Sequence, residues 1–569
     1  MSFKKKPGTE EDVFCLTFPL ICEPWQRDRL DQYFSNAQHM ENCLIAWVRA
    51  QVVQLERTRK WRRNQKHITK VCAEIGEVQK LILSSKAKLE KLNEKLKSIE
   101  SSSEQKALRK NRSLLKKELK DADSRLQAVK KQVKACYDIR TEMIAEYGLT
   151  SDGLDQQMKK YRDHYSIHSA VTQKITARVW KSVKKYFYGN GKEIHFVKWT
   201  DFMSIAGKNN ITGITYADRL ISVAGLSLKV KLSAKDPYDY ETQALARKIH
   251  FCGISRRWYP DGWHYFAQLY LGGTPPIKVH KATGELLHPI GSGRVGLDIG
   301  PQTLAAVGDQ QVSLNVLASG IDDIHAEIRR IQRKMDRSRR ATNQWAFDEK
   351  GSVIPINKVP PEHLKNKKRN WYKSKEYLRL ESKLRYLHGK IARQRVELLN
   401  RLANQLLSYG DEFYIEKMDW KALAKRAKET KVSQKTGKYV SKKRFGKSIA
   451  NRAPATFEHI LENKVKHNNG SYTEINTWKA KASQYDHQTK ACKKKHLGQR
   501  YHVLQDGRKV QRDLYSAFLI QNTNETRDGF IQELLERKFE HFYNMQTEEL
   551  NKLSHIAVPL PNSMGIHAA

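Results

Sequence analysis

The sequence predicts a multidomain α+β protein, in which a helical lobe interrupts a small β-barrel and an α/β domain with a helical and loop insertion follows. Three observations support this prediction. Strand-like segments occur both before and after a long helical stretch, at residues 13–20 and 193–271. Apolar residues follow heptad spacing through residues 76–147, which is typical of a coiled coil. From Arg294 onward, apolar strands alternate with helical patterns, as in a sheet covered by helices.

The helical lobe begins at Pro24, because proline is favoured in the first turn of a helix. Farther on, apolar residues form a heptad seam on both sides of a serine break at 101–103. The seam contains Leu89, Leu92, Leu96, Ile99, Leu108, Leu115, Leu119, Ala122, Leu126, Val129 and Val133. We therefore expect an antiparallel helical hairpin. Its role is open between a packing or dimerising coiled coil and a basic arm that contacts the phosphates of a nucleic-acid duplex.

The barrel is predicted from one strand before the lobe and several after it. The expected strands are Val13–Leu20, Glu193–Trp199, Leu220–Leu232, Lys248–Tyr259 and His264–Leu271, and a helix at about 167–188 precedes the later ones. Pro260-Asp261-Gly262 is a tight-turn signal that joins the last two strands as a hairpin. The aromatic residues beside this turn either fill the barrel or stack on bases. They are Trp258, Tyr259, Trp263 and Tyr265.

The α/β domain begins with a predicted hairpin whose first strand contains Asp298, and a third strand follows at 311–317. Helices are expected at 321–339, 374–408 and 454–466, and residues 342–370 are expected to form a long loop. The strand at 412–415 ends in Glu416, and another strand is expected at 472–477. The last helix begins near Gln511 and has Asp513 in its first turn, where the helix dipole favours a carboxylate.

Three acids thus occupy comparable positions: Asp298 within a strand, Glu416 at the end of a strand, and Asp513 at the start of a helix. Taken singly, each has an ordinary explanation, as a turn residue, a strand-end ion pair and a helix-terminal charge. Taken together, their order matches the plan of an RNase H-like nuclease. Cleavage of a phosphodiester by two magnesium ions requires such oxygen ligands. We therefore expect these three acids to be catalytic and to hold two Mg²⁺ ions.

The charge of the chain predicts a polyanionic partner. Its 104 lysines and arginines exceed its 61 acids by 43. Neither a signal peptide nor an apolar run of about 18 residues is found, so nucleic acid is preferred over a membrane. Seven dispersed cysteines suit a reducing cytoplasm. Basic runs are often merely solvated, but two here are dense enough to predict phosphate contact. They contain Arg329, Arg330, Arg333, Lys334, Arg337 and Arg340, and Lys442, Lys443 and Arg444 of a linker at 421–445.

The three acid-bearing segments resemble the RuvC motifs of TnpB, a transposon-encoded RNA-guided nuclease, and of the compact type V CRISPR effectors. These segments are Gly-Leu-Asp-Ile-Gly around Asp298, Phe-Tyr-Ile-Glu-Lys-Met around Glu416, and Arg-Asp-Leu-Tyr-Ser-Ala around Asp513. The stretches 331–342 and 444–454 are also similar to that family. The resemblance is specific over residues 294–522 and only architectural before them.

The resemblance implies a domain plan. Residues 1–22 would give the first strand of a wedge barrel, 23–190 a helical recognition lobe with its coiled-coil hairpin at 76–147, and 191–290 the rest of the barrel. Residues 291–480 would form the first part of the RuvC nuclease domain. Residues 481–509 would form a target-loading lobe, and 510–569 the third motif with a C-terminal tail.

One departure from the family lies in the 481–509 segment. Members of the family usually have a zinc ribbon with two C-x-x-C pairs there, whereas this chain has Cys492 with His487, His496 and His502. Four zinc ligands at recognised spacings are lacking, so we expect no structural zinc. The segment would then be either a metal-free target-loading lobe or a degenerate loop without a role.

The resemblance therefore implies an RNA-guided DNA endonuclease of the prokaryotic cytoplasm with a single RuvC site. Its partners would be a guide RNA, either of the omega type or a crRNA/tracrRNA pair, and double-stranded target DNA. The oligomeric state is open between monomer and homodimer. The alternative function is a nuclease-inactive, RNA-guided DNA-binding repressor. A plain structural nucleic-acid-binding protein is a further alternative, but it would have no use for three carboxylates in such positions.

Overall fold

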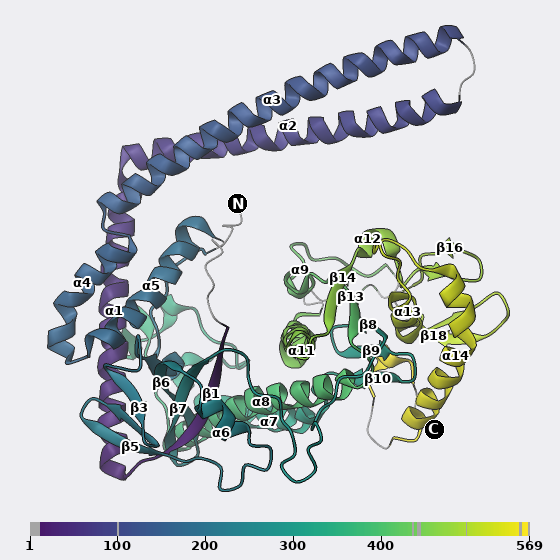
Figure 1. Cartoon of the computed structure of the whole chain (residues 1–569). Helices are drawn as coiled ribbons and strands as arrows, with labels where there is room; N and C mark the ends of the chain where they lie inside the picture. The colour runs from purple at the N-terminus through teal and green to yellow at the C-terminus, as the bar shows by residue number, and fades with distance from the viewer. Residues whose placement is uncertain are drawn as a thin grey trace. The chain divides into compact units, whose positions relative to one another are not determined.

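The computed structural model describes residues 12–98, 102–189, 191–434, 437, 439–440, 445–496, 498–556 and 560–566 (Figure 1). The chain divides into two compact units. The first comprises residues 1–233, 245–257 and 263–273, and the second comprises residues 234–244, 258–262 and 274–569. The predicted multidomain α+β class is confirmed: a near-closed antiparallel barrel, long helices and a mixed sheet are all present. The finer domain boundaries remain predictions.

The first unit contains a curled seven-stranded sheet in the order β2-β6-β7-β1-β5-β4-β3. Its strands are β1 (Val13–Ile21), β2 (Ser204–Ala206), β3 (Ile214–Ala217), β4 (Leu220–Val223), β5 (Leu226–Val230), β6 (Ile249–Tyr259) and β7 (Gly262–Gly272). Strand β1 pairs with both β5 and β7, although more than 180 residues separate it from either in sequence. The N-terminal strand therefore completes a barrel whose other strands come after the helical lobe, as predicted.

Two strand predictions were wrong in detail. The stretch 193–199 is not a strand, because helix α1 (Pro24–Arg57) satisfies its backbone instead. Asn42 accepts from the Val197 amide at 2.8 Å and donates to the Val197 carbonyl at 3.0 Å. Residues 220–232 form two strands, β4 and β5, because Ala224 and Gly225 adopt positive φ and turn the chain back. A periodicity of two cannot reveal either effect.

The aromatic residues beside the β6–β7 turn are mainly structural. Trp263 and Tyr265 are buried in the barrel. The guanidinium of the fully buried Arg256 lies over the Trp263 ring at 4.1 Å and over Trp199 at 3.6 Å. A buried cation stacked in this way stabilises the barrel, so these rings are used for packing and not for binding a ligand. Trp258 and Tyr259 are half-buried.

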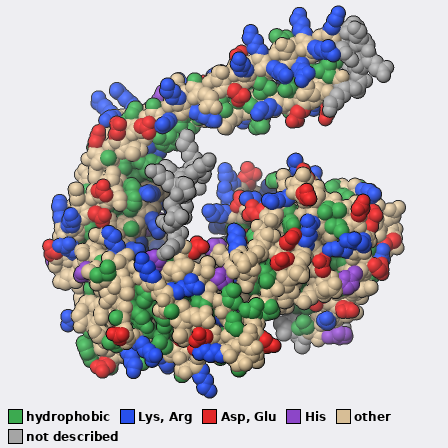
Figure 2. All heavy atoms as spheres, viewed as in Figure 1, with side chains coloured by type: hydrophobic (Ala, Val, Ile, Leu, Met, Phe, Trp, Pro, Cys, Tyr) green, Lys and Arg blue, Asp and Glu red, His purple; other side chains and the backbone are tan. Residues whose placement is uncertain are grey.

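The helical lobe consists of α1, α2 (Arg59–Ser98), α3 (Ser102–Glu146), α4 (Ser151–Tyr165) and α5 (Ser169–Tyr188). Helices α2 and α3 pack against each other as the predicted hairpin (Figure 1). Val71, Val78, Ile82, Ala122 and Leu126 are among the buried residues of its seam. The outer surface of this hairpin carries many lysines and arginines (Figure 2). Ile99 and Ser101 of the predicted seam and break lie outside the described residues.

The second unit is organised around a five-stranded mixed sheet in the order β10-β9-β8-β13-β14. Its strands are β8 (Arg294–Ile299), β9 (Thr303–Val307), β10 (Val312–Val316), β13 (Glu412–Glu416) and β14 (Ser471–Ile475). The first three form the predicted meander, while β13 pairs in parallel with both β8 and β14. The remaining strands are short hairpin strands: β11 (Leu364–Lys365), β12 (Lys368–Arg369), β15 (Tyr485–Asp486), β16 (Ala491–Cys492), β17 (Tyr501–Val503) and β18 (Lys509–Gln511).

Helices cover both faces of this sheet. One face packs against α8 (Lys375–Leu407) and α11 (Pro454–His467), and the other against α13 (Arg512–Gln521) and α14 (Gln532–Ser554). Helix α7 (Asp322–Thr342) packs along α8 through Ile328, Ile331 and Met335. The other helices are α6 (Tyr240–Leu245), α9 (Trp420–Ala424), α10 (Gly446–Arg452) and α12 (Thr477–Ala480).

Gly296 of β8 allows α13 to approach the sheet. A Cβ atom at this position would lie 2.0 Å from the Ala517 carbonyl oxygen and 2.4 Å from the Gln521 amide nitrogen, both of α13. Backbone atoms cannot move aside as a flexible side chain can. Glycine is therefore required for this helix, and with it Asp513, to lie against β8.

We expect Gly296→Ala to destabilise the second unit by more than about 2 kcal/mol, because overpacking here forces a helix away from the sheet. Gly389→Ala in α8 is the matched control, since its Cβ would meet only the end of the Arg393 side chain, at 3.2 Å. The control should retain or slightly raise stability, because alanine favours helix. Thermal unfolding of both variants measures the difference, and equal melting temperatures would contradict the role given to Gly296.

Candidate active site

Parallel pairing places Asp298 and Glu416 at the same level of the sheet. The register joins Leu297 to Ile415, so the next residues along the two strands are Asp298 and Glu416. Leu297, Ile299, Phe413 and Ile415 belong to the core on the α8 side. Because side chains alternate along a strand, both acids project toward the α13 side. They lie at the carboxyl ends of adjacent parallel strands, where open α/β sheets commonly bind ligands.

Helix α13 brings the third acid to this edge. The buried Gln511 caps the helix by accepting a hydrogen bond from the Leu514 amide at 2.7 Å, and it donates to the Met564 carbonyl at 3.3 Å. This cap fixes where the helix starts and therefore where Asp513 lies. Arg512 donates to the Asp513 carboxylate at 3.0 Å, and the side chains of both residues are largely buried.

The electrostatics show that the three acids are near one another. Burial raises the pKa of Asp298 well above its usual range, and the charges of Asp513 and Glu416 raise it further. The Ser516 hydroxyl and Arg512 oppose this rise. Burial also raises the pKa of Glu416 to about 7, which the backbone of Ala482 partly offsets. Carboxylates that repel one another in a partly desolvated site are stabilised by a cation.

The side chains as they stand do not form a closed metal site. Within the described part of the chain, no group of three or more His, Cys, Asp or Glu residues is arranged to hold a metal ion. However, Oε1 of Glu416 is buried and has no hydrogen-bond partner. An unpartnered buried carboxylate oxygen beside two further acids suits a hard divalent cation, which takes oxygen ligands. The chemistry of this donor set, three carboxylates, therefore fits magnesium.

The predicted basic helix is α7, and its phosphate-binding candidates lie on its exposed face. Arg329, Arg330, Arg333, Lys334, Arg337 and Arg340 are all exposed. Arg340 pairs with Asp336 at 2.8 Å, whereas Arg333 and Arg337 form no ion pair with any residue that the structure describes. The buried Arg452 fixes the start of this helix by donating to Asp322 at 2.8 Å and to the Ala318 carbonyl at 2.8 Å. Lys442, Lys443 and Arg444 lie outside the described residues.

Two short hairpins lie in or at the end of the 481–509 segment, where β15 pairs with β16 and β17 pairs with β18. His502 hydrogen-bonds to Asp486 at 2.9 Å, and this contact joins β17 to β15. His487 is buried against the Tyr515 hydroxyl at 2.7 Å, while Cys492 and His496 are exposed. The residues considered as zinc ligands therefore point to different partners. Whether this lobe is free of zinc remains a prediction.

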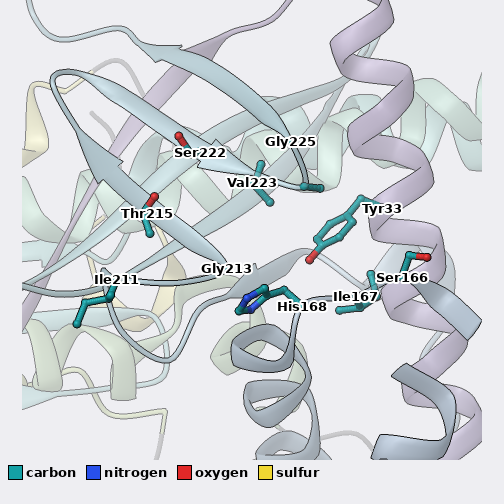
Figure 3. Close-up of a pocket in the computed structure, with 11 residues that line it drawn as sticks. Tyr33, Ser166, Ile167, His168, Ile211, Gly213, Thr215, Ser222, Val223 and Gly225 are labelled. Atoms are coloured by element: carbon teal, nitrogen blue, oxygen red, sulfur yellow. The ribbon is translucent and has the colours of Figure 1, made fainter. Parts of the chain in front are cut away.

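The first unit contains a separate cavity of about 540 Å³ between the β3–β4 hairpin and the junction of α4 with α5 (Figure 3). Tyr33 and His168 face its interior, and Thr215, Ser222 and Val223 line it. Burial raises the pKa of Tyr33 to about 12, so its hydroxyl remains protonated at neutral pH. None of the three acids is among the residues that line it.

Comparisons with known proteins identify no family. No family model and no curated protein matches the chain. Among solved structures, one chain of a CRISPR-Cas12f ternary complex determined by cryo-EM is similar over 90% of this chain and 99% of that chain, with 11% sequence identity and a TM-score of 0.21. A similarity this weak carries no argument about fold or function. None of the helices in the described residues is long and apolar enough to cross a membrane.

Sequence reasoning missed two residues of this site. Arg512 and Ser516 both act on the acids, Arg512 by pairing with Asp513 and Ser516 by facing Asp298. The adjacency of Arg512 to Asp513 was a signal, since a neighbouring cation can hold a carboxylate. Ser516 follows Asp513 by one helical turn, so its position beside the acids depends on the helix packing against β8.

Asp298→Asn should stabilise the metal-free protein at pH 7.5, by about 1 kcal/mol or more, because it removes one charge from a repelling cluster. An acid whose pKa is higher in the folded state than in the unfolded state lowers the free energy of unfolding as pH rises above the unfolded-state pKa. The gain should therefore be small near pH 4 and should grow as pH rises. Thermal unfolding in chelator across this range tests it, and Asp411→Asn is a control outside the cluster.

Proposed function

We propose that this chain is a metal-dependent, RNA-guided DNA endonuclease with a single RuvC-type active site. The observation that carries the proposal is the grouping of Asp298, Glu416 and Asp513 at one edge of the sheet, where their charges oppose one another. The motifs around these acids support the same class. The net charge of +43 supports polyanionic partners, here a guide RNA and double-stranded target DNA.

In this proposal the three acids hold two magnesium ions. Magnesium held there would supply activation of the attacking water and stabilisation of the leaving oxygen of the phosphodiester. Asp298 and Glu416 supply oxygens from adjacent strands, and Asp513 supplies one from the helix. Arg512 holds Asp513 in place through their ion pair. The exposed arginines of α7 contact the backbone of the nucleic acid, while base pairing with the guide selects the target.

The alternative within the same class is a nuclease-inactive, RNA-guided DNA-binding repressor. The intact acid trio favours cleavage, since a repressor gains nothing from carboxylates that repel one another. The deciding experiment incubates the purified ribonucleoprotein with target plasmid and magnesium. A preparation that binds its target but never cuts it would leave the repressor as the better proposal. Sequencing the RNA that copurifies would separate a transposon-derived guide from a CRISPR-derived one.

Asp298→Ala, Glu416→Ala and Asp513→Ala should each abolish cleavage and leave guided binding intact, because each removes a metal ligand while base pairing supplies binding. The losses should not add, since each change disables the same unit. Cleavage is measured in magnesium and binding in calcium, whose flexible coordination supports little cutting. Glu412→Ala, at the other end of β13, is a matched control that should still cut. A variant of the trio that cuts at the wild-type rate would remove its residue from the site.

The double change Arg333→Ala and Arg337→Ala should weaken binding about equally on all target sequences, because these side chains face phosphates rather than bases. The slope of log affinity against log salt should fall by about 2. Titrations of several targets over a salt series measure both effects. A loss confined to particular targets would refute the assignment of these arginines to backbone contact.

A further inference from the structure

Residues 343–372 form an ordered module in the second unit, although their composition predicted a long loop. The fully buried Asn343 clamps its two ends, because it donates to the Tyr372 carbonyl at 2.9 Å and accepts from the Tyr372 amide at 2.8 Å. The rings of Trp345 and His363 stack 4.3 Å apart, and Arg369 donates to the Ile354 carbonyl. These contacts fix the base of a short hairpin made of β11 and β12.

The hairpin ends in a two-residue turn, Asn366-Lys367, with both residues in the left-handed region at φ +49° and +58°. Such a turn favours asparagine followed by glycine. A side chain in the left-handed conformation costs roughly 1–2 kcal/mol, and asparagine tolerates it better than lysine does. The chain thus places a lysine at the position where glycine would be more stable.

The residues that flank the turn add a second unfavourable choice. Lys365 pairs directly with Lys368 across the hairpin, and both side chains are exposed. Like charges at directly opposite positions destabilise a strand pair. The module contains the acids Asp348, Glu349 and Glu362, but within the described residues none forms an ion pair with Lys365, Lys367 or Lys368. Three uncompensated cations therefore occupy four consecutive positions on a hairpin whose base is held by hydrogen bonds.

We propose that this hairpin tip is a binding site for the phosphate backbone of a nucleic-acid duplex. An anion over the tip would relieve the repulsion between Lys365 and Lys368, and Lys367 would add a third contact. A two-residue turn on a two-stranded ribbon is narrow enough to enter the major groove, and lysines on both strands of the ribbon can reach phosphates on either side. The surplus of 43 positive charges makes a polyanion the fitting partner.

Substitutions that remove the two unfavourable choices test the proposal, because they should stabilise the hairpin and weaken its binding to a duplex. Lys367→Gly removes the strained side chain, and Lys368→Glu turns the repelling pair into an attractive one. The double variant should melt at or above the wild-type temperature. It should bind a 30-base-pair DNA duplex at least about fivefold more weakly at low salt, with a salt slope reduced by about 2.

The control removes the same charge elsewhere. Arg379→Ala, Arg401→Ala and Lys466→Ala together also lower the net charge by three, but each of these exposed cations is already paired with a carboxylate on its own helix, Glu376, Glu397 and Glu462. Their loss should change duplex affinity less than the tip variant does. If both proteins lost the same amount of duplex affinity, the effect of the tip would be one of net charge alone, and the proposal would be overturned.

Four probes identify the phosphate source, and none depends on cleavage. Wild-type protein and the tip variant are titrated with DNA duplex, RNA duplex, single-stranded DNA and inorganic phosphate. A difference confined to one or both duplexes supports the proposal and names the partner. A difference seen only with single strands or only with phosphate overturns it, as does a tip variant that binds every probe like the wild type. A cleavage-inactive protein with a normal tip effect would refute the proposed function and leave this site intact.

Discussion

Parallel pairing of β13 with β8 is the constraint on which the candidate active site depends. The two strands are separated by more than 100 residues, and their pairing sets Glu416 level with Asp298. A shift of one residue in this register would turn one of the acids to the α8 side of the sheet. Leu297, Ile299, Phe413 and Ile415, which alternate with the acids along the two strands and fill the core on the α8 side, prevent such a shift. The same hydrophobic packing that stabilises the sheet therefore holds the carboxylates together.

The close contact between α13 and β8 extends this arrangement to a third element. Gly296 lets the helix backbone approach the strand, and the Gln511 cap determines where the helix begins. Crowding of three acids costs stability in the absence of a cation, and the surrounding core offsets that cost. Sites that bind charged groups commonly contain crowded like charges that lower the stability of the protein.

Much of the second unit could be predicted from sequence, because its strands are strongly apolar and its helices have clear ends. Pro454 begins α11 and Ser374 caps α8, as their positions in the sequence suggest. Long-range effects were missed. Asn42 replaces a strand partner for Val197, and Asn343 closes the 343–372 module over a separation of 29 residues. Local patterns carry no information about which distant side chain will satisfy a backbone group.

The acids could be located from sequence, but their interaction could not. Asp298 within an apolar strand and Glu416 at the end of another are visible as departures from pattern. The rise in their pKa values depends on burial and, for Asp298, on the charges of Asp513 and Glu416, which tertiary packing brings near it. Ser516 joins the site only because α13 packs against β8, whereas Arg512 comes with Asp513 as its neighbour in sequence. Prediction from sequence thus names the chemical groups, and the fold determines their charge state.

The α2–α3 hairpin gives the first unit a long reach. A helix of 40 residues, the length of α2, extends about 60 Å at 1.5 Å per residue. The same distance along a double helix, at about 3.4 Å per base pair, covers roughly 18 base pairs, or nearly two turns. A thin pair of helices spans this distance with far fewer residues than a globular domain would need. Its seam buries only a narrow apolar stripe, so most of its side chains remain free to meet a partner.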